Sequence, residues 1–151
     1  MLEERCKAEA IRLHDFLQDW LTGDLPRKPE AFAAFADALG AGLIVVSPNG
    51  SVSAREAILA EFESIHGAVA ADRGAFRIWV ENFRILRAEG DLALALYEEW
   101  HRRRDETSAR LSTVLFRAPP GAPGGVEWLH VHETWLPGMA PKAGERFPEP
   151  A

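Results

Sequence analysis

Two histidines, His130 and His132, stand two residues apart in the segment from Trp128 to Pro137. Alternate residues of a strand share a face, so the two imidazoles would lie side by side, as they do in many zinc sites. Zinc usually needs three or four protein ligands, and no carboxylate or third histidine joins the pair on that face. The pattern favours a hydrogen-bonded pair at a subunit interface over a metal site, and we expect no metal.

The other reactive side chains give no recognisable catalytic motif. Cys6 is the only cysteine, which excludes an internal disulfide and cysteine-rich metal sites. It falls on the apolar stripe of a predicted helix, where we expect a buried, inert thiol. His14 and His66 lie beside similar stripes and are expected to be partly buried and hydrogen-bonded. We find no glycine-rich phosphate loop and no serine or cysteine nucleophile with an identifiable general base. No cofactor is expected.

The composition argues against nucleic acid or an anionic membrane as the main partner, because the 151 residues carry a net charge of −6. No apolar run reaches transmembrane length, and the N-terminus lacks the apolar core of a signal peptide. We therefore expect a cytoplasmic protein. The one basic cluster, residues 101–104, is followed by Asp105 and Glu106. It predicts a solvated strand end or, alternatively, a rim that steers anions.

Hydrophobic periodicity divides the chain into helices followed by strands. Residues 2–22 carry apolar side chains at steps of three and four, which predicts an amphipathic helix capped by Gly23. A second helix is predicted from Pro29 to Gly40, and a third follows the capping-box spacing of Ser53 and Glu56. After a short β-rich run at residues 43–46, the period changes to two. Strands are predicted at about residues 75–87, 91–102, 109–118 and 126–136.

This order of elements indicates an α+β fold, a cone-shaped barrel of a curved antiparallel sheet wrapped against three N-terminal helices. We expect one domain over residues 1–137 and a Pro/Gly-rich tail over residues 138–151 that lies against a surface. The last strand is apolar on both faces. It should therefore be covered on one side by helices and on the other by a second subunit.

Four short motifs, taken in order and spacing, resemble the nuclear transport factor 2-like superfamily. Within it, the chain is similar to ketosteroid-isomerase-like and SnoaL-type polyketide-cyclase-like bacterial proteins, over about residues 5–137. The motifs are Thr-Gly-Asp at 22–24, Ser-Pro-Asn-Gly at 47–50, Gly-Asp-Leu-Ala at 90–93 and Trp-Leu-His-Val-His at 128–132. The resemblance implies a conical pocket between sheet and helices, and homodimers that pair through the outer sheet face.

The ketosteroid isomerase mechanism can be checked against the residues that the resemblance aligns. It needs a carboxylate base and an oxyanion hole made by a tyrosine and a protonated aspartate. The tyrosine position corresponds to Phe16 and the base position to Ser47, and residues 110–117 contain no acid. All three roles are vacant, so isomerase chemistry by that route is not expected.

The association domain of the calcium/calmodulin-dependent protein kinase is similar in the Trp-x-x-Val-His core at residues 128–132. Its pocket arginines correspond to Glu99, Thr113 and Trp135, so its anion-binding property does not transfer to these positions. The same registration predicts which residues of three strands face inward. They are Tyr97, Glu99 and His101, then Leu111, Thr113 and Leu115, then Leu129, Val131, Glu133 and Trp135.

Glu99 and Glu133 are the candidate acid/base residues, because both are predicted to face one pocket, where desolvation can raise the pKa of a carboxyl group. The alternative is that each pairs with an arginine, for which Arg77, Arg84 and Arg87 of a neighbouring strand are available. The predicted ligand-binding residues are Trp20, Tyr97, Glu99, Thr113, Glu133 and Trp135.

The five tryptophans favour a small apolar or aromatic ligand for any cavity. The expected function is the binding of such a molecule by a homodimer. One alternative is a cofactor-independent lyase, cyclase or isomerase that uses Glu99 or Glu133, with Tyr97 or His101 as donor. The other is a structural oligomerisation domain whose cone is filled by side chains. The predicted dimer contact has two rows, Leu92, Leu94 and Leu96, and Trp128, His130 and His132.

Overall fold

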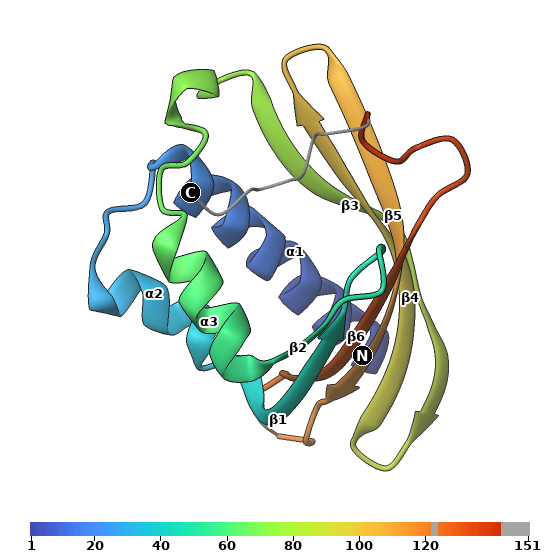
Figure 1. The fold of residues 1–151 in the computed structure, drawn as a ribbon. Coiled ribbons are helices and arrows are strands. Elements are labelled where there is room, and N and C mark those ends of the chain that lie inside the picture. The colour runs from blue at the N-terminus through green and yellow to red at the C-terminus, as the bar shows by residue number, and fades with distance from the viewer. Residues whose placement is uncertain (122–123, 143–151) are drawn as a thin grey trace.

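The computed structural model describes residues 1–121 and 124–142, in which three helices pack on one face of a six-stranded sheet (Figure 1). The helices are α1 (Leu2–Thr22), α2 (Pro29–Ala36) and α3 (Arg55–Ser64), and a 3-10 turn, η1, spans Ala70–Asp72. The strands are β1 (Leu39–Val46), β2 (Val52–Ala54), β3 (Phe76–Glu89), β4 (Leu92–Arg103), β5 (Glu106–Arg117) and β6 (Glu127–Trp135).

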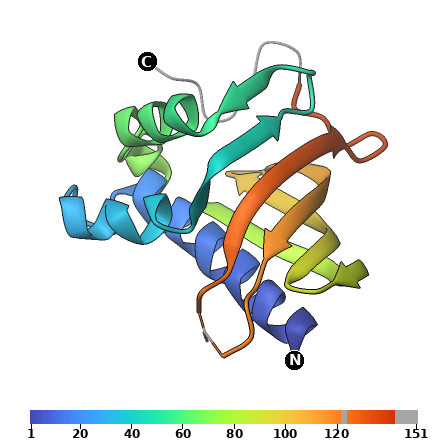
Figure 2. The ribbon, with the colours of Figure 1, turned by 90° about the horizontal axis from the view of Figure 1, so that it is seen from below.

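Helix α1 lies along the concave side of the sheet, and the long strands curve around it (Figure 2). Its apolar stripe is buried from Cys6 through Leu13 to Leu21, as the spacing of three and four predicts. The helix ends at Gly23, whose φ of 79° is left-handed and whose N–H donates to the carbonyl of Trp20. Glycine is favoured there because it has no Cβ to clash in this conformation.

The sheet has the strand order β2-β1-β6-β5-β4-β3. The α+β class and the three helices are confirmed, but two details of the predicted barrel are wrong: the sheet is open, and β1 runs parallel to β6. Direct hairpin connections make β3, β4, β5 and β6 antiparallel, whereas the chain between β1 and β6 contains α3 and three other long strands. No local turn constrains the direction of that pair, so hairpin signals in the sequence could not predict it.

Buried residues alternate with more exposed ones along β4 and along the second half of β5. On β4, Tyr97 and Glu99 are buried on the side of the helices, and the row of Leu92, Leu94 and Leu96 is half-buried on the outer face. On β5, the buried residues are Ser112, Val114 and Phe116. Thr113 and its alternate neighbours therefore lie on the outer face, and the register predicted for this strand was wrong by one residue.

Strand β6 contains an irregularity that changes which residues face inward. Its pairing with β5 shifts where Leu115 and Phe116 oppose His130 and Trp128. Trp128 consequently belongs to the core, where its indole N–H donates to a carboxylate oxygen of Glu9 at 2.7 Å. The prediction that Trp128 shares the outer face with His130 was wrong, because a bulge breaks the period of two.

The chain after β6 continues beside the first half of β5. The amide of Ala109 donates to the carbonyl of Met139 at 3.0 Å, which holds residues 138–142 beside β5. The remainder of the predicted tail, residues 143–151, lies outside the described residues. Among the helices described, none combines the length and the apolar content needed to cross a membrane.

Gly40 marks the closest approach of β1 to β6. A Cβ at this position would lie 2.9 Å from the backbone oxygen of Trp128, whereas a Cβ at Gly42 would meet nothing within 4 Å. Gly40→Ala should therefore lower the free energy of unfolding by about 1–3 kcal/mol, because the backbone of β6 must shift. Gly42→Ala is the matched control and should stay within about 0.5 kcal/mol of the wild type. Urea denaturation measures both, and equal stabilities would contradict a close strand contact.

Candidate functional site

A cavity of about 710 Å³ lies between α1 and the concave face of the sheet. Apolar side chains form much of its wall, including Leu17, Leu43, Phe62, Val131 and Trp135. Residues of the β1–β2 hairpin and residues 140–142 also line it. Ionisable residues also line the cavity, and we call six of them the polar cluster: His14, Tyr97, Glu99, His101, Arg110 and Glu133.

Glu99 of β4 is the centre of the polar cluster. One carboxylate oxygen lies 2.7 Å from Nε2 of His14, and the other is hydrogen-bonded to Nε2 of His101. The second oxygen is also 3.9 Å from Nε of Arg110. His14 is fixed from its other side, since its Nδ1 donates to the carbonyl of Ala10 at 2.6 Å. The carboxylate is thus held between residues of α1, β4 and β5.

The charges in this group follow from burial and from Glu99. Burial alone would raise the pKa of Glu99, but His14, His101 and Arg110 hold it well below its usual range. Burial also acts to lower the pKa of His14, and attraction to Glu99 outweighs it, so that this pKa is raised. For His101 burial prevails and lowers the pKa. These three pKa directions agree with an ionised Glu99, a protonated His14 and a neutral His101.

Glu133 of β6 makes a longer hydrogen bond, with Arg110, than Glu99 makes with His14. Its carboxylate is 3.3 Å from Nη1 of Arg110, and both side chains are 11% exposed. Burial, together with the nearby negative charge of Glu99, raises the pKa of Glu133 to about 7, although Arg110 acts to lower it. Glu133 can therefore gain or lose a proton near neutral pH, which is the property required of a general acid or base.

Arg110 of β5 connects the two carboxylates. Its guanidinium carbon lies 4.8 Å from the ring centroid of Trp135, a cation–π contact with a residue of the cavity wall. Tyr97 completes the group. Burial and the carboxylates of Glu99 and Glu133 raise its pKa well above the usual value of 10, so the phenol stays a neutral donor.

The structure brings together four of the six residues predicted to bind a ligand. Tyr97, Glu99, Glu133 and Trp135 all line the cavity. Thr113 lies on the outer face for the reason given above. Trp20 is 1% exposed in an aromatic cluster with Phe16, Phe32 and Phe35, and its indole N–H donates to the carbonyl of Phe62. These two residues are therefore not part of the cavity wall.

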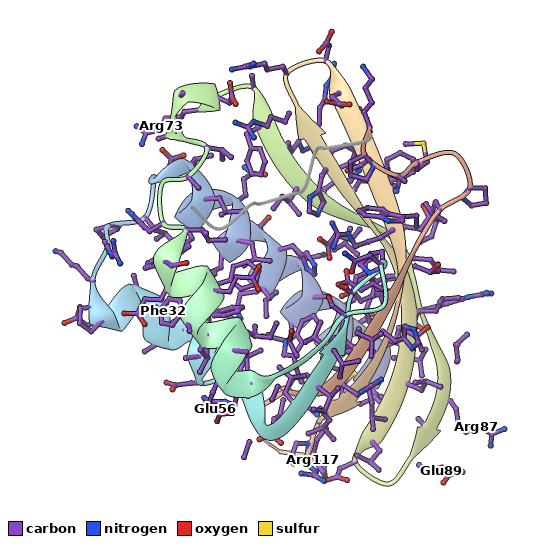
Figure 3. The ribbon with its side chains drawn as sticks, viewed as in Figure 1. Phe32, Glu56, Arg73, Arg87, Glu89 and Arg117 are labelled. Carbon is purple, nitrogen blue, oxygen red and sulfur yellow. The ribbon has the colours of Figure 1, made fainter. Side chains whose placement is uncertain are left out.

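The arginine that contacts the carboxylates is not one of those proposed from the sequence. Arg77, Arg84 and Arg87 of β3 are exposed. Arg87 pairs with Glu89 at 3.6 Å, and Figure 3 shows both at the β3–β4 turn, away from the helices. Their place is taken by Arg110 of β5, the strand that lies between β4 and β6.

Sequence reasoning missed Arg110 and the role of His14. Both faces of β5 carry apolar residues, so the period of two gave no signal for choosing between Arg110 and Leu111 as the inward residue. His14 stands on the apolar stripe of α1, one residue after Leu13. Its expected burial is confirmed at 3% exposure, but its partner lies 85 positions away in the chain. No local pattern could identify that partner.

Other candidates from the sequence remain outside the cavity. His130 and His132 have ring centroids 6.4 Å apart, and the described residues contain no group of three potential ligands suited to a metal ion. Of the basic cluster, Arg103 and Arg104 both contact the buried Asp72, at 2.6 and 2.7 Å. These arginines therefore hold the β4–β5 turn to η1.

Comparison with known proteins places the chain in a family. The family model described as sucrose-6-phosphate phosphohydrolase C-terminal matches residues 7–137. The chain belongs to this family. Sucrose-phosphatase 2 of Nicotiana tabacum is 23% identical over 133 residues, which cover 87% of this chain and 31% of that protein. The chain thus spans less than a third of the length of this relative.

Solved structures confirm the predicted fold of this family member. An NTF-2 like protein of unknown function, PA1314 from Pseudomonas aeruginosa, is 27% identical with a TM-score of 0.76, covering 87% of this chain and 98% of that one. The CamKII hub homology domain of Chlamydomonas reinhardtii is 13% identical with a TM-score of 0.60, covering 87% and 97%. The predicted nuclear transport factor 2-like fold is therefore correct.

The raised pKa of Glu133 makes a prediction about stability. The pKa of Glu133 is about 7 in the folded state against an ordinary value of 4.5. Between these pH values the folded state therefore binds more protons than the unfolded state does. Stability should fall as pH rises through this window, by about 3 kcal/mol in total. Glu133→Gln should remove this loss, so its advantage over the wild type should grow from about pH 5 to about pH 8.

Urea denaturation across this pH range measures the difference. Glu127→Gln is the control, because Glu127 lies on the same strand but is 41% exposed. Parallel stability curves for Glu133→Gln and the wild type would contradict the raised pKa.

Proposed function

We propose that this domain binds a small, largely apolar molecule in the cavity between α1 and the sheet. The observation that carries the proposal is the cavity itself: about 710 Å³, with many aliphatic and aromatic side chains in its wall and the buried polar cluster on one part of it. Binding sites for small molecules typically have volumes of about 300–1,000 Å³, apolar walls and a few converging polar groups. The apolar wall supplies affinity, and the polar cluster orients the molecule.

A second candidate is a cofactor-independent lyase, cyclase or isomerase. The specific observation in its favour is that Glu133 lines the cavity with a pKa of about 7, near Tyr97 as a neutral donor. Glu99 is less suited to proton transfer, because its pKa is held well below the usual range. Deuterium exchange into the α-carbon of a bound ketone, lost in Glu133→Gln, would distinguish an enzyme from a binding protein.

A purely structural oligomerisation domain is the least supported alternative. Such a domain needs no cavity and no buried ionisable group that titrates near neutral pH. The cone of this chain contains both. The name of the curated relatives refers to proteins about three times as long as the matched segment, and the cavity gives no separate support for phosphatase activity.

We further propose that the domain forms a homodimer through the outer face of the sheet. All three helices cover the opposite face (Figure 1). The outer face carries the half-buried Leu94 and Leu96, and the stacked pair Trp79 and Trp100, whose rings are 6.0 Å apart. An apolar surface of this kind is typical of an interface, and a hub homology domain shares the fold, which is consistent with self-association.

The cavity proposal predicts that a large residue on its wall blocks binding. Val131→Trp should weaken the binding of the neutral probe N-phenyl-1-naphthylamine at least tenfold, because the indole would occupy the cavity. Thr134→Trp places the same residue on an exposed position of the same strand and should bind as the wild type does. Probe fluorescence measures affinity, and circular dichroism checks the fold. Equal binding by both variants would refute the site.

The dimer proposal predicts that a charge on the outer face separates the subunits. Leu96→Glu should raise the dimer dissociation constant about tenfold or more, because a carboxylate would be buried against the partner. Ile11→Glu is the control, since Ile11 is an apolar residue of α1 that is 41% exposed. Sedimentation velocity reports the assembly. A wild-type protein that is monomeric at micromolar concentration would overturn the proposal.

A further inference from the structure

Arg110 is buried with few of its hydrogen bonds made. Its side chain is 11% exposed, and a guanidinium has five N–H donors. Among the residues that the structure describes, it donates one hydrogen bond, to Glu133 at 3.3 Å. Its Nε is buried without a hydrogen-bond partner, since Glu99 is 3.9 Å away. A buried donor without an acceptor is costly, so the group has capacity for an additional acceptor.

The charges around the cavity limit what that acceptor can be. Glu99 and His14 form one balanced pair, and Arg110 and an ionised Glu133 form a second. A ligand that brings one negative charge can restore balance only if Glu133 takes up a proton. A positively charged ligand would leave an excess of positive charge, since both carboxylates already have cationic partners. Protonation of Glu133 leaves one positive charge, that of Arg110, without a partner, so a doubly charged anion would bring one negative charge too many.

We propose that the ligand is an apolar monocarboxylate whose carboxylate binds Arg110 and replaces Glu133, which becomes protonated as the ligand enters. This inference rests on the proposed binding function and adds the class of ligand. The planar guanidinium matches a carboxylate in a two-point contact, and it is already fixed against Trp135. The apolar body of the ligand then lies along Leu17, Leu43 and Val131.

The proton taken up has a defined place. It resides on a carboxylate oxygen of Glu133, which then donates a hydrogen bond instead of accepting one from Arg110. Other ionisable groups of several helices and strands line the cavity together with Glu133. They are His14 of α1, Glu61 of α3, Tyr97, Glu99 and His101 of β4, Arg110 of β5 and Lys142 of the chain after β6. Of these, Arg110 alone is within hydrogen-bond distance of Glu133 among the described residues.

The experiment is calorimetric titration of the full chain with decanoate, decanol and decylamine, which share an apolar body and differ in charge. Decanoate should bind at least tenfold more tightly than decanol at about pH 6, and decylamine more weakly than either. Titration in two buffers of different ionisation enthalpy gives the number of protons exchanged. Uptake should be about 0.9 proton per decanoate at about pH 8 and about 0.1 at about pH 6. Affinity should fall about tenfold over that interval.

Two variants separate the roles of the charged groups. Glu133→Gln should bind decanoate without proton uptake and with the same affinity at both pH values. Arg110→Met should lose about 30-fold or more in decanoate affinity while its affinity for decanol changes less than threefold. Arg117→Met is the control on the same strand, since Arg117 is 47% exposed and contacts Asp91 and Glu127 at the far end of β5 (Figure 3). It should bind decanoate as the wild type does.

The outcomes distinguish this inference from the proposed function. Equal binding of decanoate and decanol, or decanoate binding without proton uptake at about pH 8, overturns the inference and leaves a cavity that binds apolar molecules. Preference for decylamine also overturns it. If decanoate, decanol and N-phenyl-1-naphthylamine all fail to bind, the proposed function falls as well. Should Arg110→Met fail to fold, the proton count with Glu133→Gln still decides the question.

Discussion

The negative charge of Glu99 inside the domain is the constraint on which the site depends. A buried carboxylate is stable only when cations or donors surround it, because removal from water is costly. Three elements supply those groups: His14 from α1, His101 from β4 and Arg110 from β5. Helix α1 must therefore lie across the concave face in one position along the sheet, and the same packing leaves the cavity open beside the cluster.

The distribution of these partners explains why two carboxylates on adjacent strands differ. Glu99 has two histidines and part of the charge of Arg110, so it remains ionised. Burial and the charge of Glu99 leave the pKa of Glu133 at about 7, although Arg110, its hydrogen-bond partner at 3.3 Å, acts to lower it. One arginine shared between two acids thus produces a structural carboxylate and a titratable one. The titratable carboxylate, Glu133, is the group that can exchange a proton when a ligand binds or reacts.

The two faces of the sheet carry different properties through the alternation of side chains. On β4, the inward residues progress from Ala93 and Ala95 to Tyr97 and Glu99, from small to polar. The small residues are fully buried in the core, and the polar ones line the cavity. The intervening leucines form the outer face that we assign to a second subunit. A single strand therefore contributes to the core, the cavity and the proposed interface.

The sequence by itself determined the elements and the fold class, because helical and strand periods depend on residues close together in the chain. Helix α1 and the long strands follow from that local pattern, whereas the burial of Tyr97 and Glu99 was predicted from the family resemblance of the last strand. The tertiary structure alone decided the inward face of β5, the parallel β1–β6 pair and the bulge that turns Trp128 into the core. It also decided the contact of His14 with Glu99 and the identity of Arg110 as the shared cation. Each of these depends on a contact between distant segments, and both faces of β5 and β6 are apolar enough that periodicity permits either choice.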